Sequence, residues 1–336
     1  MKLIKAKENP ILKPNKNNQW ENYCVLNPAV IYSEELNKFV MLYRAAGDDV
    51  EHYIYLGLAY SDDGINFTRM SDEPIFSPNK DGSDGGGVED PRLIKMGDWY
   101  YMTYASRPYA PGRYWLEEAK PWFNPPKDGP TYLSWNNTLT HLAITKDFKT
   151  YKKLGRITDS RDDDRDVYIF PDKVNGKYVR ISRPMFACGE GYQNPNPAIW
   201  ISYSDDIMEW KDRELLMQGK YWWESKKIGG SCPPIKTKYG WFMITHGVSK
   251  DDDTYRVGAI IMDLENPSKI IARTKEPIME PEFDFETKGL YNGCVFPTGN
   301  VVKDNILYVY YGAADKFVCV ATCEFDKLLE AIINEK

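Results

Sequence analysis

The chain has 336 residues, of which 42% are hydrophobic, and its formal net charge is −6 at pH 7. This length allows two domains or one large all-β domain, and the acidic balance argues against general binding to nucleic acid or to an anionic membrane. The 6 cysteines show no paired CxxC spacing and there are 3 histidines, so we expect no metal site. Neither a signal peptide nor an apolar run of about 18 residues is visible, which predicts a cytoplasmic protein with free thiols.

Short runs rich in β-branched and aromatic residues, broken by Gly, Asn, Asp and Pro, predict an all-β protein. The one helical pattern is the C-terminal "DKLLEAIINEK". Five runs end a strand before an acidic turn, and their equivalent residues are Ser61, Thr145, Ser204, Asp263 and Thr322, at steps of 84, 59, 59 and 59 residues. The longer first step indicates an insertion rich in Pro and Trp, which we place at about 107–135.

Two further series of apolar runs precede these five, so each unit of about 60 residues supplies at least three strands. Repeated sheets of this kind predict a five-bladed β-propeller that forms a single domain over residues 1–336. A long β-sandwich is the alternative, but the fixed spacing favours blades. In a propeller the first strand of each blade lines the central channel, so residues at the start of these strands should meet in one pocket.

Asp90 opens such a strand in "GGGVEDPRL", and Asn27 holds the equivalent place 63 residues earlier. A single charge at a strand end is usually solvated. Several charged or basic residues nevertheless occupy equivalent inward positions: Arg44, Arg165, Arg183, Lys227, His246 and Asp315. Cations gathered inside an acidic protein indicate an anionic ligand, and arginine suits bidentate binding of phosphate.

The sequence resembles glycoside hydrolase family 130, the β-mannoside phosphorylases. The shared elements are "GGGVEDPRL", "DVYIFPDKVNGKYVRISRP", "WESKKIGGSCPPIKTKYGWFMITHGV", "EPEFDFETKGLYNGCVFPTG" and "LYVYYGAAD". The resemblance implies a five-bladed propeller with Asp90 as the general acid. It also implies two sets of binding residues: Arg165, Arg183, Lys227, His246 and Tyr255 for inorganic phosphate, and Asn27, Arg44 and Asp315 for the mannosyl unit in the −1 subsite. Glu89 and Arg92 would support Asp90 or the sugar.

The implied reaction is inverting phosphorolysis of a β-mannoside to α-D-mannose 1-phosphate, with inorganic phosphate as co-substrate and no cofactor. One acid suffices because phosphate is already a nucleophile, whereas an inverting hydrolase needs a second carboxylate as base. Glu224 or Asp166 would be the base in the hydrolase alternative. A carbohydrate-binding propeller with Trp and Tyr platforms is the third hypothesis.

The glycosidic linkage stays open at this point, either β-1,4 to N-acetylglucosamine or glucose, or β-1,2 in mannooligosaccharides. The 107–135 segment could cover the +1 subsite, or it could form the interface of a homo-oligomer.

Overall fold

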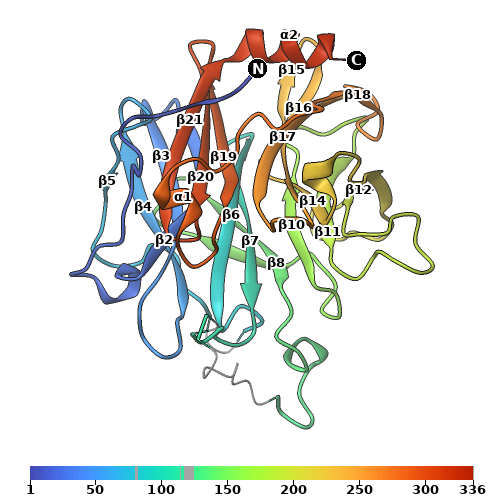
Figure 1. Ribbon diagram of the computed structural model, residues 1–336. Helices are drawn as coiled ribbons and strands as arrows, with labels where there is room; N and C mark the ends of the chain where they lie inside the picture. The colour runs from blue at the N-terminus through green and yellow to red at the C-terminus, as the bar shows by residue number, and fades with distance from the viewer. Residues whose placement is uncertain (80–81, 114, 117–124, 336) are drawn as a thin grey trace.

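The computed structural model describes residues 1–79, 82–113, 115–116 and 125–335, and most of its regular structure is β-strand (Figure 1). The strands fall into five groups along the chain, with antiparallel neighbours inside each group. The first group is β2 (Cys24–Ser33), β3 (Lys38–Ala46), β4 (Ile54–Ser61) and β5 (Thr68–Arg69); the second is β6 (Gly87–Met96), β7 (Trp99–Arg107), β8 (Leu139–Thr145) and β9 (Lys152–Arg156). The third is β10 (Asp164–Ile169), β11 (Tyr178–Pro184), β12 (Ile199–Ser204) and β13 (Glu214–Met217).

The fourth group is β14 (Lys227–Gly230), β15 (Ile235–Thr237), β16 (Gly240–Val248), β17 (Tyr255–Met262) and β18 (Ile270–Arg273), and the fifth is β19 (Val295–Lys303), β20 (Ile306–Ala313), β21 (Phe317–Glu324) and β1 (Ile4–Lys5). The first two groups are joined into one sheet by a single parallel pair, Ile54 with Gly87. The short helices are η1 (Gln19–Glu21), η2 (Thr131–Leu133), η3 (Trp222–Glu224) and α1 (Asp284–Thr287), and the longer C-terminal helix is α2 (Phe325–Asn334).

The strand repeat predicted from the sequence is confirmed. The five aligned residues fall within, at the end of, or directly after the third strand in the hydrogen-bonded order of their groups: β4, β8, β12, β17 and β21. The all-β class and the C-terminal helix are confirmed as well. The last group is completed by the N-terminal strand β1, where Ile4 pairs with Thr322 of β21, so both ends of the chain lie together at the top of Figure 1.

The core lies between neighbouring groups, and β16 shows how one strand serves two of them. All of its residues are buried. Phe242 packs in a cluster with Tyr311 of the fifth group, whereas Trp241 packs in a cluster with Ile181 of the third. Successive side chains of a strand point to opposite faces. Both faces of β16 are therefore covered, which explains why the strand reads as a continuous apolar run rather than an alternating one.

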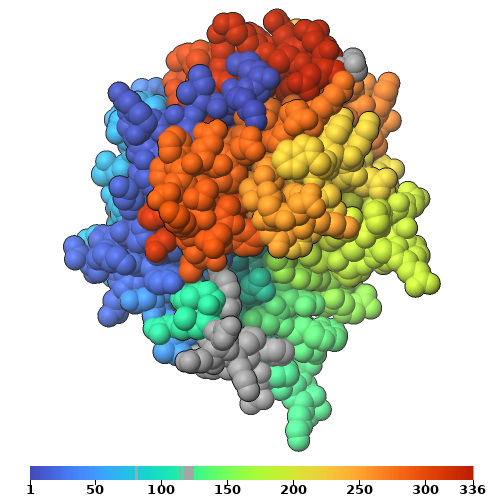
Figure 2. Space-filling model, viewed as in Figure 1, coloured from blue at the N-terminus to red at the C-terminus, as the bar shows by residue number. Residues whose placement is uncertain are grey.

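The predicted insertion connects β7 to β8. Residues 114 and 117–124, within the predicted 107–135, lie outside the described residues. The part from residue 125 to β8 projects from the lower end of the molecule in Figures 1 and 2. In the described part of the chain, none of the helices has the length and apolar character needed to cross a bilayer.

Candidate active site

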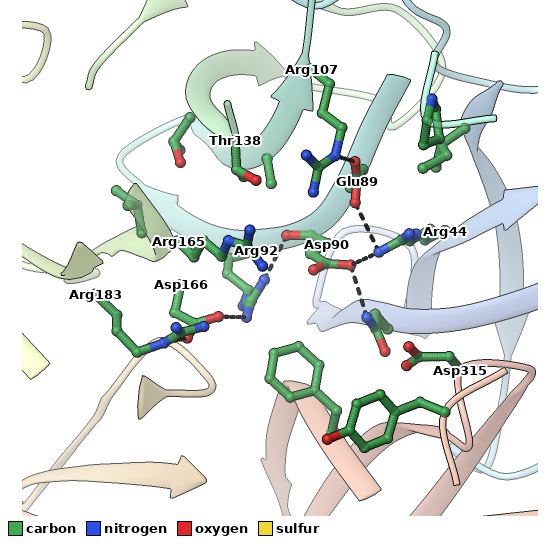
Figure 3. Close-up of a pocket in the computed structure, with 18 of the residues that line it drawn as sticks. Arg44, Glu89, Asp90, Arg92, Arg107, Thr138, Arg165, Asp166, Arg183 and Asp315 are labelled. Atoms are coloured by element: carbon green, nitrogen blue, oxygen red, sulfur yellow. Dashed lines mark hydrogen bonds and ion pairs between the residues drawn. The ribbon is translucent and has the colours of Figure 1, made fainter. Parts of the chain in front are cut away.

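A cavity of about 500 Å³ opens where the first strands of the groups come together, and all five groups contribute to its wall (Figure 3). This volume lies in the range of small-molecule sites. Nine of the residues expected in the site line it: Asn27, Arg44, Glu89, Asp90, Arg92, Arg165, Arg183, Tyr255 and Asp315. Residues separated by up to 288 positions in the chain, Asn27 and Asp315, therefore share one cavity (315 − 27 = 288).

A β-bulge turns one polar side chain of each of three first strands into this cavity. The strand register shifts between Leu26 and Ala29 in β2, between Glu89 and Arg92 in β6, and between Arg165 and Tyr168 in β10. The bulges contain Asn27, Asp90 and Asp166, with φ angles of 44°, 45° and 52°. Few residues other than glycine adopt positive φ, and Asn and Asp do so most readily. Bulges of this kind redirect side chains beside active sites.

Asp90 is held at the centre of the cavity by donors from three strands. Its Oδ1 accepts hydrogen bonds from Asn27 Nδ2 at 2.8 Å and from Arg44 Nη1 at 2.9 Å. Arg92 fixes the backbone from behind, because its Nη1 donates to the Asp90 carbonyl at 2.6 Å and its Nε to the Ser231 carbonyl at 2.8 Å. The Asp90 carboxyl remains 21% exposed and can reach a substrate.

Glu89, next to Asp90, is a buried carboxylate between two arginines. It lies 3.0 Å from Arg44 Nη1 and accepts a hydrogen bond from Arg107 Nε at 2.9 Å. Burial would raise the pKa of Glu89, but Arg44 and Arg107 outweigh it and lower that pKa below the usual range. Glu89 is therefore an anion that holds Arg44 against Asp90, as the chain of contacts in Figure 3 shows.

Asp315 faces the same side of the cavity at a further positive φ of 53°. Burial is the main reason why the pKa of this carboxyl is raised to about 6, with Asp90 adding to the effect and Arg44 opposing it. A carboxyl with this pKa can be protonated near neutral pH, and it can then donate a hydrogen bond to a sugar hydroxyl.

Two arginines on the third group form a second, basic side of the cavity, and each is fixed by its own aspartate. Arg165 makes a bidentate pair with Asp163, with both N–O distances 2.9 Å. Arg183 Nε donates to Asp166 Oδ2 at 2.6 Å. Burial would raise the pKa of Asp166, but the Arg183 guanidinium outweighs it, with Arg92 contributing, and lowers that pKa to about 2.

Lys227 adds a cation beside these arginines. Its Nζ donates to the Tyr255 hydroxyl at 2.5 Å, and within the described residues no carboxylate lies at ion-pair distance from it. Burial is the main reason why the pKa of Lys227 is lowered to about 8, and the nearby positive charge of Arg183 contributes. A half-buried lysine without a carboxylate partner is a favourable position for an approaching anion.

Lys227 and His246 do not belong to the cavity wall formed by the described residues, in contrast to the other expected site residues. His246 is fully buried behind Asp166, with its Nε2 3.5 Å from Asp166 Oδ2 and its Nδ1 3.0 Å from Ser231 Oγ. Burial lowers the pKa of His246 to about 3, so it is neutral and not one of the cations that the sequence suggested. Its Nε2 has no hydrogen-bond partner among the residues that the structure covers.

Sequence reasoning missed several residues of the site. Asp166 entered only as a hypothetical base, although its place in "RDVYIF" matches that of Asn27 and Asp90 and could have identified it. Asp163 was hidden in the acidic run "RDDDRD". Arg107 was considered only as the start of the insertion, yet it lines the cavity and contacts Glu89.

Comparison with known proteins identifies the family of this chain. The model of glycoside hydrolase family 130, described as β-1,4-mannooligosaccharide phosphorylase, matches residues 2–124 and 131–334. The chain belongs to this family. It is 38% identical to a 1,2-β-oligomannan phosphorylase of Thermoanaerobacter sp. (strain X514), over 96% of this chain and 98% of the relative. It is also 38% identical to a β-1,2-mannobiose phosphorylase of the same organism, over 97% and 99%.

The fold is also found in a solved structure. The β-1,2-mannobiose phosphorylase of Listeria innocua, in complex with β-1,2-mannobiose, superimposes with a TM-score of 0.79 at 25% identity and covers 99% of both chains.

Proposed function

We propose that this protein is an inverting phosphorylase of β-1,2-linked mannooligosaccharides, which transfers the terminal mannosyl unit to inorganic phosphate. Family membership supports phosphorolysis of β-mannosides, and the two relatives at 38% identity, both named for β-1,2-linked substrates, support this linkage over β-1,4. The observation that carries the proposal is the partly exposed carboxyl of Asp90 in the same cavity as Arg165 and Arg183, beside Lys227, which has no carboxylate partner among the described residues.

In the proposed reaction a phosphate oxygen forms a bond to C1 of the mannosyl unit while the bond from C1 to the glycosidic oxygen breaks. Asp90 supplies the proton that this leaving oxygen needs, either directly or through a hydroxyl of the mannose. The products are α-D-mannose 1-phosphate and an oligosaccharide shorter by one unit. Asn27, Arg44 and Asp315 hold the mannosyl unit, and Glu89 and Arg92 keep Arg44 and Asp90 in place.

Phosphate is held by Arg165, Arg183, Lys227 and the Tyr255 hydroxyl, and His246 lies behind this set, with its Nε2 3.5 Å from Asp166 Oδ2. The positive charge of Lys227 favours the phosphate dianion, and each arginine keeps N–H groups beyond those used by its aspartate. Because phosphate is an anion and a nucleophile at neutral pH, its orientation by these groups replaces the base that water would require.

The hydrolase alternative receives less support. Glu224 is buried against Arg273, with both carboxylate oxygens 2.6 Å from Arg273 Nη2, and it is not part of the cavity wall. Asp166 lines the cavity, but a carboxylate with a pKa of about 2 is a weak base for activating water.

We further propose that the five strand groups are the blades of a five-bladed propeller and that residues 1–336 form one catalytic domain. The packing of each group against the next and the closure of the last group by β1 support this architecture. The free thiol state of the 6 cysteines supports a reducing compartment such as the cytoplasm.

The test is phosphate dependence. Purified protein is incubated with β-1,2-mannobiose in phosphate buffer and in a phosphate-free buffer of equal ionic strength, and the products are identified by NMR. We expect α-D-mannose 1-phosphate with phosphate and no cleavage without it. Release of free mannose at the same rate in both buffers would establish a hydrolase. A parallel incubation with β-1,4-mannobiose tests the linkage.

A further inference from the structure

Arg107 occupies a part of the cavity to which no role has been given. It ends β7, its side chain is 23% exposed, and it lines the cavity together with Pro111 and Asn136. In Figure 3 it lies on the far side of Glu89 from Arg44 and Asp90, away from Arg183. No aspartate or glutamate other than Glu89 pairs with it in the part of the chain that the structure describes.

The position of Arg107 is fixed by the neck of the insertion. Its Nε donates to Glu89 at 2.9 Å and its Nη1 to the Asn136 carbonyl at 3.2 Å. The Asn136 side chain in turn accepts the Tyr109 backbone N–H at 3.1 Å, which ties the two ends of the insertion together. Gly86 makes room for this neck, because a Cβ at that position would lie 1.8 Å from the Tyr109 carbonyl carbon.

The first turn of the insertion is also attached to the first strand group. The Gly112 N–H donates to the Glu51 carbonyl at 2.9 Å, and the Trp115 ring stacks on Tyr23 with centroids 4.8 Å apart. The described start of the insertion is therefore fixed at the rim of the cavity. Pro111, from this start, and Asn136, from the other end of the insertion, both line the cavity.

Inversion places the two reacting groups on opposite faces of the mannosyl ring. If phosphate lies at Arg165, Arg183 and Lys227, the leaving sugar lies on the side away from them. Arg107, Pro111 and Asn136 are the lining residues that the insertion neck contributes, and in Figure 3 Arg107 lies away from Arg183, across Glu89 from Asp90. Two nitrogens of Arg107 are engaged, and the third, Nη2, carries two more N–H donors that suit sugar hydroxyls.

We propose that Arg107 is a specificity residue of the +1 subsite and that it donates hydrogen bonds to the hydroxyls of the acceptor mannose. This inference depends on the proposed phosphorylase function. Loss of Arg107 leaves Glu89 paired with Arg44, so no buried charge is abandoned and the catalytic strand keeps its main partner.

The experiment uses the synthetic direction, with α-D-mannose 1-phosphate as donor and β-1,2-mannobiose as acceptor. For Arg107→Ala we expect KM for the acceptor to rise about 10- to 100-fold, the range for a lost hydrogen bond to a charged group. KM for the donor and kcat at saturating acceptor should change less than about twofold, because the residues proposed to bind the mannosyl and phosphate groups of the donor, and Asp90, are unchanged. Arg161→Ala, which removes a 71% exposed arginine, is the control for the loss of charge.

A fall in kcat at saturating acceptor with an unchanged acceptor KM would overturn the inference, since Arg107 would then act through Glu89 on Asp90. An unchanged acceptor KM with unchanged kcat would overturn it as well. If Arg107→Ala fails to fold, Arg107→Lys serves, with the same expected split between acceptor and donor KM. A wild-type protein that consumes no α-D-mannose 1-phosphate at all would instead refute the proposed function.

Discussion

The lowered pKa of Lys227 predicts how phosphate use depends on pH. If the protonated amine is needed to bind phosphate, KM for phosphate should be flat below the pKa of about 8 and should rise above it. By about pH 9 roughly one-tenth of the lysine stays protonated, so KM, expressed as the concentration of the phosphate dianion, should be about tenfold higher than at pH 7. Inorganic phosphate is mainly the dianion throughout the upper part of this range, so the change would report the enzyme.

The assay measures initial rates of β-1,2-mannobiose phosphorolysis with phosphate varied at several pH values. Lys227→Arg is the matched variant, because a guanidinium remains charged at all of them. It should bind phosphate with a KM that stays level where the wild-type KM rises, even if its absolute KM is higher. The KM for mannobiose should not follow the same curve in either protein. A wild-type phosphate KM that is level up to about pH 9.5, or a variant with the same rise as wild type, would refute the role of Lys227.

Three further predictions follow from the contacts of the site. Asp90→Asn should lower kcat about 10²- to 10⁴-fold while the urea unfolding midpoint stays close to wild type, because it removes the acid and keeps the shape of the side chain. Asp163→Asn should raise KM for phosphate about tenfold and leave KM for mannobiose unchanged, because Arg165 loses its bidentate partner but not its charge. Gly86→Ala should lower the free energy of unfolding by about 1–3 kcal/mol, measured by urea titration, because the new Cβ overlaps the Tyr109 carbonyl.

Each of these has an outcome that would contradict it. An Asp90→Asn protein with near-normal turnover would remove Asp90 from the role of acid. For Asp163 the control is Asp159→Asn, whose partner Arg161 is exposed and not part of the cavity wall. Equal effects of the two changes would deny a special role to Asp163. A Gly86→Ala protein as stable as wild type would show that the insertion neck can shift.

The elements of the fold were predictable because their signals are local. Each strand is a short apolar or aromatic run bounded by turn residues, and the period of 59 residues places β8, β12, β17 and β21 without any knowledge of their packing. The candidate site followed from the same repeat, since equivalent positions in successive groups meet at one end of the strands.

The partners of the charged residues were not predictable in this way. In the run "RDDDRD" successive aspartates pair with different arginines: Asp163 with the adjacent Arg165, and Asp162 with Arg213, which lies 51 positions away. Which partner each finds depends on the direction of its side chain along a strand with a bulge. The neutral state of His246 likewise depends on complete burial, which the surrounding groups create and the residue type does not reveal.

The hydrogen-bond partners determine what each polar side chain of the site can do, as a comparison of Asn27, Asp90 and Asp166 shows. Each of the three lies in an equivalent bulge of the first strand of its group, and their φ angles are similar and positive. The backbone therefore presents three short polar side chains to one cavity in the same manner. Asn27 can only donate to and accept from its neighbours, and it orients Asp90. Asp90 accepts two hydrogen bonds on one oxygen and its side chain stays 21% exposed, whereas the Asp166 side chain is 4% exposed and paired with Arg183 as an anion. Because the repeat supplies equivalent carboxylates but different partners, one of them stays accessible from the cavity while the other fixes a cation. In the proposed reaction this asymmetry leaves Asp90 available as the acid and favours an attacking anion over an attacking water.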